Sequence, residues 1–369
     1  VSPTGRVYAI AEQVYEGIIE FNKQGDYNRY LGQNDVVANP LKELLRDYLT
    51  DEQLASFALT LPPLFTSIST DSKGFIYATS YPDTESGSVT SQNMVKAINT
   101  SGKDCMKRNG YVTPNGDAVY ISSSPNANAI LGPSYLVDVT INKAGNFTVV
   151  DEVRGRLFTY DSDGNLLYIA GEQPGGTKQG TSSSLSSSII KPVAIDYLYR
   201  SYIDKNGQEV NEEIIIVADQ QSKSLMYYET TEFGRLVNQA TAAYTAGVDT
   251  AEKAEAVRAI WEEVRQRNTN YELAYLGIGK CLLVESDYVA TKDEQLELYQ
   301  EAMANFKLAH SGTYYSKAFG RYRDQVLKDN FSWIMTGAVV LVLAYTGYIV
   351  YKTVKKRQAK KIRVEGGNK

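Results

Sequence analysis

A short turn signature recurs through residues 2–207: an Asn, Asp, Ser or Thr, then two residues, then a Gly. The eight copies lie at 2–5, 22–25, 71–74, 99–102, 113–116, 142–145, 161–164 and 204–207. Glycine readily adopts the left-handed backbone conformation that such turns need, and a tight turn leads directly into a hairpin strand. The signature therefore predicts that this part of the chain consists of many short antiparallel strands.

Strand-like runs, rich in β-branched and aromatic residues, follow several of these turns. They lie at residues 7–10, 75–78, 118–121, 147–150 and 166–169. The clearest unit covers residues 135–171, which we interpret as four short strands joined by tight turns, and a second copy covers 191–229. Four-stranded units repeated at this spacing are typical of the blades of a β-propeller.

The repeated unit resembles the NHL-repeat β-propellers, in which strands alternate with Asp/Asn-x-x-Gly turns and one strand ends in a structural Asp. Asp151 in Val-Val-Asp and Asp219 in Val-Ala-Asp match that Asp. The resemblance implies a mainly β propeller over residues 1–234, with about four blades, the first incomplete. It implies further blades upstream of Val1, an incomplete ring within this chain, and a structural rather than catalytic role for Asp151 and Asp219.

Helical spacing of apolar residues predicts a helical insertion at about residues 37–59, on the rim of the propeller. The same spacing dominates residues 235–330, where we expect one helix capped by Asp249 and another opened by the capping box Thr269-x-x-Glu272. Two further helices are predicted over residues 299–309 and 314–327.

The helical region, 235–330, resembles a tetratricopeptide repeat. The resemblance rests on the Leu276-Gly277 pair and on the spacing of Ala302, Phe306 and Ala309. A generic antiparallel helical hairpin fits the same apolar pattern and is the alternative.

Residues 331–351 are predicted to form a transmembrane helix, because these 21 residues contain no charge. A helix of this length spans roughly 30 Å, the thickness of the hydrocarbon core of a bilayer. Seven Lys/Arg lie within 15 residues after the run and four within 15 residues before it. This bias predicts a single-pass protein of the plasma membrane, with an extracytoplasmic N-terminal domain and a cytoplasmic C-terminus.

The basic tail, residues 352–369, holds eight Lys/Arg and one acid, so the rest of the chain has a net charge of −12. Membrane lipid is an expected partner of the tail, which serves either as a stop-transfer flank or as a binder of anionic head groups. The acidic body excludes nucleic acid as an expected partner, because nucleic-acid binding needs a basic face.

The order of propeller, tetratricopeptide-like helices and membrane segment resembles a group of Gram-positive cell-surface proteins. Members often continue into a Yip-type membrane domain and often accompany carbohydrate ABC transporters. The resemblance implies a membrane-anchored extracytoplasmic binding or scaffold protein that is accessory to carbohydrate transport. It also implies a protein partner, with transporter components as candidates. The 28 tyrosines of the chain add a carbohydrate ligand as a weaker expectation, since aromatic rings stack on sugars.

We expect no catalysis, no metal and no cofactor. The chain has one histidine, His310, near the predicted membrane, so Ser–His or Cys–His chemistry would depend on it alone. The alternative is an extracytoplasmic propeller enzyme of the lactonase or lyase type, whose metal would need converging carboxylates. The acids available for that role are Asp138, Asp151, Asp196 and Asp219. A third hypothesis is an assembly scaffold that uses the helices.

Overall fold

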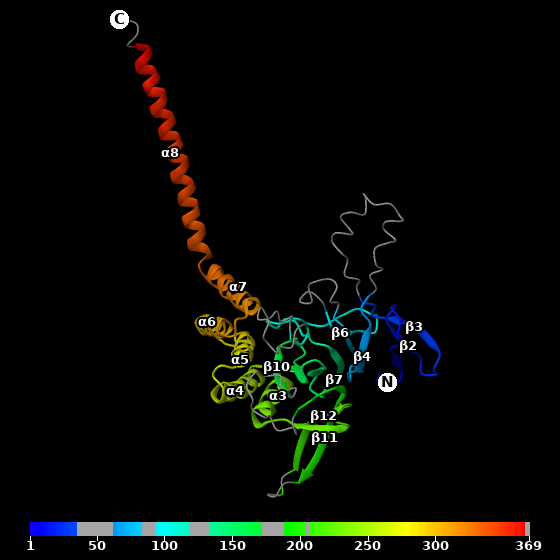
Figure 1. Ribbon diagram of the computed structural model, residues 1–369. Helices are drawn as coiled ribbons and strands as arrows, with labels where there is room; N and C mark the ends of the chain where they lie inside the picture. The colour runs from blue at the N-terminus through cyan, green and yellow to red at the C-terminus, as the bar shows by residue number, and fades with distance from the viewer. Residues whose placement is uncertain are drawn as a thin grey trace, which may run out of the picture. The chain divides into compact units, whose positions relative to one another are not determined.

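The computed structural model describes residues 1–34, 62–82, 93–117, 133–171, 188–203, 207 and 209–365, with side chains to residue 357 (Figure 1). These residues form two compact units, Val1–Gly277 and Ile278–Lys369. The predicted helical insertion at 37–59 and the predicted strand at 118–121 lie outside the described residues, as do the last residues of the basic tail.

The first unit contains four separate antiparallel sheets, each with its strands in chain order. The first is β1 (Val7–Ala9), β2 (Ile18–Phe21) and β3 (Tyr27–Leu31), and the second is β4 (Phe65–Thr70), β5 (Ile76–Ser80) and β6 (Val95–Ile98). The third is β7 (Leu136–Ile141), β8 (Phe147–Asp151), β9 (Arg156–Tyr160) and β10 (Leu166–Ala170). The fourth is β11 (Pro192–Ile203), β12 (Glu209–Asp219) and β13 (Ser224–Glu229).

The strands predicted near residues 7–10, 75–78, 147–150 and 166–169 are confirmed, as is the four-stranded unit at 135–171. Among the described residues the sheets do not close into a ring, so the propeller arrangement stays a prediction. The turn signature is confirmed in the seven copies that the structure describes in full, and all eight of its glycines have a φ between +72° and +89°. Such angles are rare for residues with a Cβ, which explains the glycine at this position.

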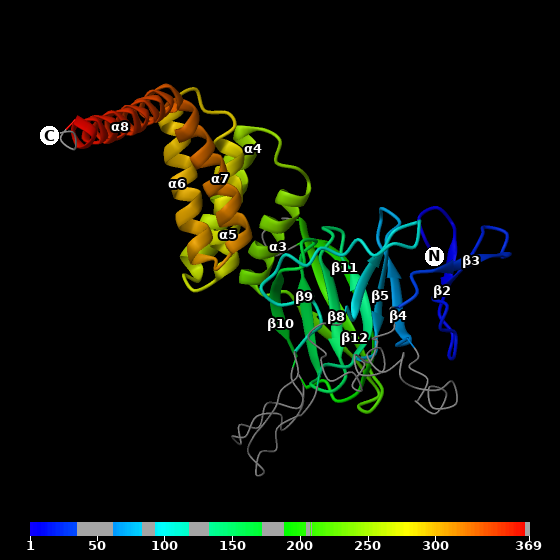
Figure 2. The same cartoon turned by 90° about the horizontal axis from the view of Figure 1, so that it is seen from above.

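Neighbouring sheets pack face to face through apolar side chains. Figure 2 shows the second to fourth sheets side by side. Phe147, Phe158 and Tyr160 of the third sheet are almost fully buried, and the rings of Phe147 and Tyr160 stack with centroids 5.2 Å apart. Because these positions alternate along each strand, one face of a sheet can be buried against its neighbour.

Helices follow the fourth sheet in the first unit. Helix α3 (Glu232–Thr245) lies against the third sheet, where Asn146 Nδ2 donates to Thr241 Oγ1 at 3.1 Å. Helix α4 (Ala251–Arg267) is capped by Thr250, whose Oγ1 accepts from the backbone N–H of Lys253. The predicted cap at Asp249 was wrong, because its carboxylate instead pairs with the Lys253 ammonium at 2.6 Å.

Helix α5 (Glu272–Glu285) begins at the Glu of the predicted capping box, so that box was also wrong. Residues 268–271 form a turn in which the Tyr271 N–H donates to the Asn268 carbonyl at 3.1 Å, and this turn delays the helix start. The second unit continues with α6 (Lys292–Leu308) and α7 (Gly312–Asp329). Helix α6 starts seven residues before the predicted position because Thr291 caps it, its Oγ1 accepting from the backbone N–H of Glu294 at 3.3 Å.

The final helix, α8 (Phe331–Glu365), is 35 residues long and includes the uncharged run. Phe331–Arg357 has a mean hydropathy of 1.8 and is long and apolar enough to cross a membrane. None of its apolar window is buried against the described residues. Asn330 separates α7 from α8, so the preceding helix does not run on into the apolar segment.

Candidate functional site

A cleft of about 680 Å³ opens in the first unit, where the turns at one end of the second and third sheets meet. Its walls are the β4–β5, β7–β8 and β9–β10 turns, the segment after β6 and the C-terminal end of α3. The lining residues with charged, aromatic or thiol groups include Lys73, Phe75, Cys105, Lys107, Lys143 and Tyr244. Three copies of the turn signature, far apart in sequence, thus contribute to one cavity.

The three turns share one internal geometry, which makes them rigid supports for the cleft. In the β4–β5 turn, Oδ1 of Asp71 accepts from the backbone N–H groups of Lys73 and Phe75 at 2.9 and 2.8 Å. Asn142 and Asp161 make the equivalent pairs of hydrogen bonds in the other two turns. Side chains of Asn and Asp stabilise such turns by hydrogen bonding to their own backbone.

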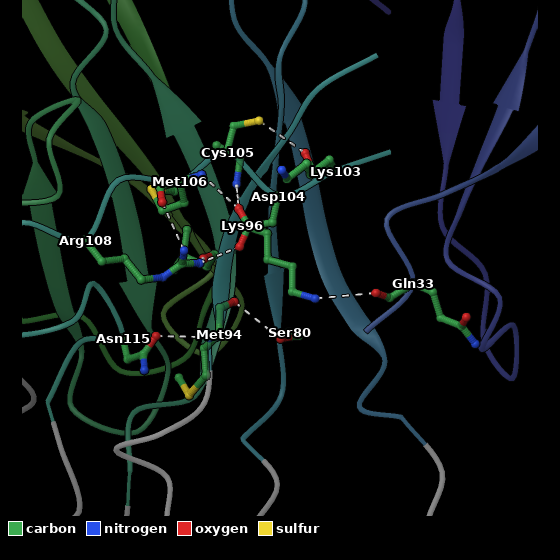
Figure 3. Close-up of polar contacts among 12 residues, drawn as sticks. Gln33, Ser80, Met94, Lys96, Lys103, Asp104, Cys105, Met106, Arg108 and Asn115 are labelled. Carbon is green, nitrogen blue, oxygen red and sulfur yellow. Dashed lines mark hydrogen bonds and ion pairs between the residues drawn. The ribbon is translucent and has the colours of Figure 1, made fainter. Parts of the chain in front are cut away.

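The segment after β6 is tied to the sheet by an arginine and an aspartate (Figure 3). Arg108 donates from Nη2 to the carbonyl of Val95 at 2.9 Å and to Oδ2 of Asp104 at 2.8 Å. Oδ1 of Asp104 in turn accepts from the N–H groups of Ala97 and Met106. These contacts place Cys105, Met106 and Lys107 in the wall of the cleft.

Charged and aromatic groups share the cleft. Lys107 pairs with Asp163 at 2.9 Å, while the ammonium of Lys143 lies 4.0 Å from the centroid of the Tyr199 ring. Within the described part of the chain, neither Lys73 nor Lys143 forms an ion pair. Phe75 and Tyr244 are half-buried. Such a mixture of ring surface and polar groups is typical of small-molecule sites.

The residues singled out for structure, Asp151 and Asp219, lie away from this cleft, each at the end of the second strand of its sheet. Asp151 is fully buried and accepts from the N–H of Tyr135 at 3.0 Å, from Ser134 Oγ at 2.7 Å and from Arg154. Asp219 accepts from Ile190 and Lys191. Each Asp thus holds the segment that enters its own sheet.

Backbone N–H donors also account for the lowered pKa of Asp219. Burial by itself would raise the pKa of this carboxyl, but the N–H groups of Ser222, Lys191 and Ile190 outweigh it and lower the pKa.

The two other acids considered for catalysis, Asp138 and Asp196, lie on the first strands of the third and fourth sheets. Asp138 links three sheets, because it accepts from the Ser67 hydroxyl on β4 and from the N–H of Ile195 on β11. Burial raises the pKa of Asp138, and the charge of Asp196 raises it further. The four acids therefore do not converge. The described residues contain no group of three or more His, Cys, Asp or Glu that could hold a metal.

No protein-family model matches the sequence, and no curated protein matches it. Structural neighbours include a catalytically inactive virginiamycin B lyase from Staphylococcus aureus with quinupristin (13% identity, 62% of this chain and 67% of that chain, TM-score 0.28). A streptogramin B lyase (12%, 63% and 67%, 0.29) and a Bacteroides thetaiotaomicron protein of unknown function (12%, 60% and 44%, 0.28) are similarly distant. Scores of this size establish neither a common ring of sheets nor a common activity.

A half-buried carboxyl that sequence analysis missed, Glu213, connects the fourth sheet to the β7–β8 turn of the cleft and to α3. Its Oε1 atom accepts from Asn142 Nδ2 at 3.0 Å, and Asn238 of α3 lies at 3.5 Å. Burial raises the pKa of Glu213, with hydrogen bonds from Asn142 and Tyr199 opposing the shift. The local sequence Glu212-Glu213-Ile214-Ile215 gave no signal that Glu213, and not Glu212, faces inward.

Glu213→Gln is expected to raise the thermal midpoint by a few degrees at neutral pH, because it removes a half-buried, partly desolvated charge and keeps the acceptor for Asn142. A raised folded-state pKa gives stability that is complete below the unfolded value and is lost as the pH rises through the folded value. The difference from the parent should therefore vanish below about pH 4.5. Thermal denaturation across pH measures it. Glu212→Gln is the control, because hydrogen bonds from Arg200 and Tyr202 lower the pKa of Glu212, and its removal should not stabilise.

Proposed function

We propose that this chain is a membrane-anchored extracytoplasmic binding protein that holds a carbohydrate in the cleft and serves as an accessory to carbohydrate ABC transport. The observation that carries the binding function is the cleft of about 680 Å³, with ring surface, ammonium groups and carboxylates in one cavity. Helix α8 supports the anchor, because its apolar segment is long enough to span a bilayer. The excess of Lys/Arg after the apolar run supports a cytoplasmic C-terminus.

An enzyme of the lactonase or lyase type is the second candidate, and Asp138 favours it. This carboxyl lies where three sheets meet, has a raised pKa and lies close to Asp196. Perturbed carboxyls are common among catalytic acids, although structural networks perturb them too. A panel of lactones and polysaccharides, assayed with metal analysis, separates the two functions. If the protein turns over one of these substrates and Asp138→Asn abolishes that turnover, the enzymatic function would be supported in place of the binding function.

The cleft assignment predicts that a bulky maleimide on Cys105 abolishes carbohydrate binding. Cys105 is exposed and lines the cleft, whereas Cys281, the other cysteine of the chain, is buried. Full-length protein in detergent should bind cellohexaose or hexagalacturonate by titration calorimetry before labelling and lose that binding afterwards. Cys105→Ser treated with the same reagent should keep it. Unchanged binding by the labelled protein, or no binding of either sugar by the unlabelled protein, would contradict the proposal.

A further inference from the structure

The cleft presents both cationic groups and hydrogen-bond acceptors to a ligand. Lys73 belongs to the β4–β5 turn and Lys143 to the β7–β8 turn, and both residues line the cavity, with the ammonium of Lys143 lying over the Tyr199 ring beside it. Lys107 also lines it, but Asp163 neutralises Lys107 at 2.9 Å. Lys143 also attracts the Glu213 carboxylate without forming an ion pair with it, so among the described residues Lys73 and Lys143 supply the positive charge that remains open to a ligand.

Acceptors line the cleft as well, and one of them, Asp71, lies in the same turn as Lys73. Asp71 uses Oδ1 for the two N–H groups of its own turn, which leaves Oδ2 to accept from a ligand hydroxyl. The end of α3, residues 242–246, also lines the cleft, and a helix C-terminus carries partial negative charge. A simple inorganic anion would satisfy the ammonium groups and leave these acceptors unused.

We propose that the cleft selects acidic saccharides, with the carboxylate of a uronic acid held by Lys73 and Lys143 and the sugar hydroxyls donating to Asp71. This inference rests on the proposed binding function and names its ligand class. Ammonium groups bind carboxylates through charge-assisted hydrogen bonds, which are stronger than neutral ones. Phe75 and Tyr244 supply half-buried ring surface for the apolar face of a sugar.

Titration calorimetry of the full-length protein in detergent tests this selection with hexagalacturonate, cellohexaose and inorganic phosphate. Hexagalacturonate should bind about 10- to 100-fold more tightly than cellohexaose, and its affinity should fall as salt is added. Lys73→Gln and Lys143→Gln should each weaken hexagalacturonate binding about 10-fold and leave cellohexaose binding unchanged. Phosphate at the same concentration should not displace hexagalacturonate.

Lys23→Gln is the matched control. Lys23 occupies the second position of the turn Asn22-Lys23-Gln24-Gly25, as Lys143 does in Asn142-Lys143-Ala144-Gly145, but it does not line the cleft. It should leave all affinities unchanged.

Equal affinity for hexagalacturonate and cellohexaose, with no effect of either cleft lysine, would overturn the acidic preference while leaving the binding function intact. Displacement of hexagalacturonate by phosphate at similar affinity would show a general anion site and would also overturn it. Loss of binding in Lys23→Gln equal to that in Lys143→Gln would show that the lysines act through overall charge and not in the cleft.

Discussion

Asp151→Ala is expected to lower the free energy of unfolding of the sheet region by about 3–5 kcal/mol, because it removes a buried carboxylate whose partners Ser134 and Arg154 are also buried. Two backbone N–H groups, from Tyr135 and Val153, and the Ser134 hydroxyl would lose their acceptor. Asp151→Asn keeps one oxygen and should cost about 1–3 kcal/mol. Urea denaturation followed by hydrogen exchange measures both the global loss and the loss of protection at Tyr135 and Val153.

Asp249→Ala is the control for this experiment, because Asp249 belongs to the same unit but is 72% exposed. Its effect should stay within about 0.5 kcal/mol, as is usual for surface substitutions. Asp151→Ala with a cost no larger than that of Asp249→Ala would contradict a structural role. A catalytic role would instead appear as lost turnover with stability preserved.

Val339→Arg combined with Leu343→Arg is expected to release the protein from membranes. The two positions lie one helical turn apart near the middle of the apolar run of α8, and both are exposed in the structure. Arginine at the centre of a transmembrane helix costs about 2.5–3.5 kcal/mol, so the pair removes most of the driving force for insertion. Carbonate extraction of membranes measures the change, with the parent in the pellet and the double variant in the supernatant.

Val354→Arg is the matched control, since it makes the same change three residues beyond the uncharged run and should leave the protein in the pellet.

The orientation of the chain in the membrane is measured by thiol labelling. A membrane-impermeant maleimide should label Cys105 in sealed right-side-out vesicles without permeabilisation. Retention of the double variant in the pellet would contradict a membrane span, and labelling only after permeabilisation would reverse the topology.

Sequence alone was sufficient for the features that depend on nearby residues. The turns are stabilised by an Asn or Asp that bonds to N–H groups two and four residues ahead, so spacing reveals them, as at Asn142. The apolar run of α8 is likewise visible from composition. Local patterns misplaced the helix starts at Asp249 and Thr269, where an ion pair and a preceding turn, respectively, took the place of the expected cap.

The cleft was decided by tertiary structure. Its walls come from turns around residues 71, 142 and 161, and the segment between them is held by Arg108 through contacts with Val95 and Asp104. The sequence predicts a similar hairpin at each turn, but it does not predict which of the turns lie next to one another in the fold. The surroundings of Asp138 are decided in the same way, because its partners Ser67 and Ile195 belong to two other sheets and meet it only once the sheets pack. The apolar packing between sheets is non-directional and joins segments that are far apart in sequence. It therefore brings together polar groups whose contact cannot be predicted from the local sequence of either one.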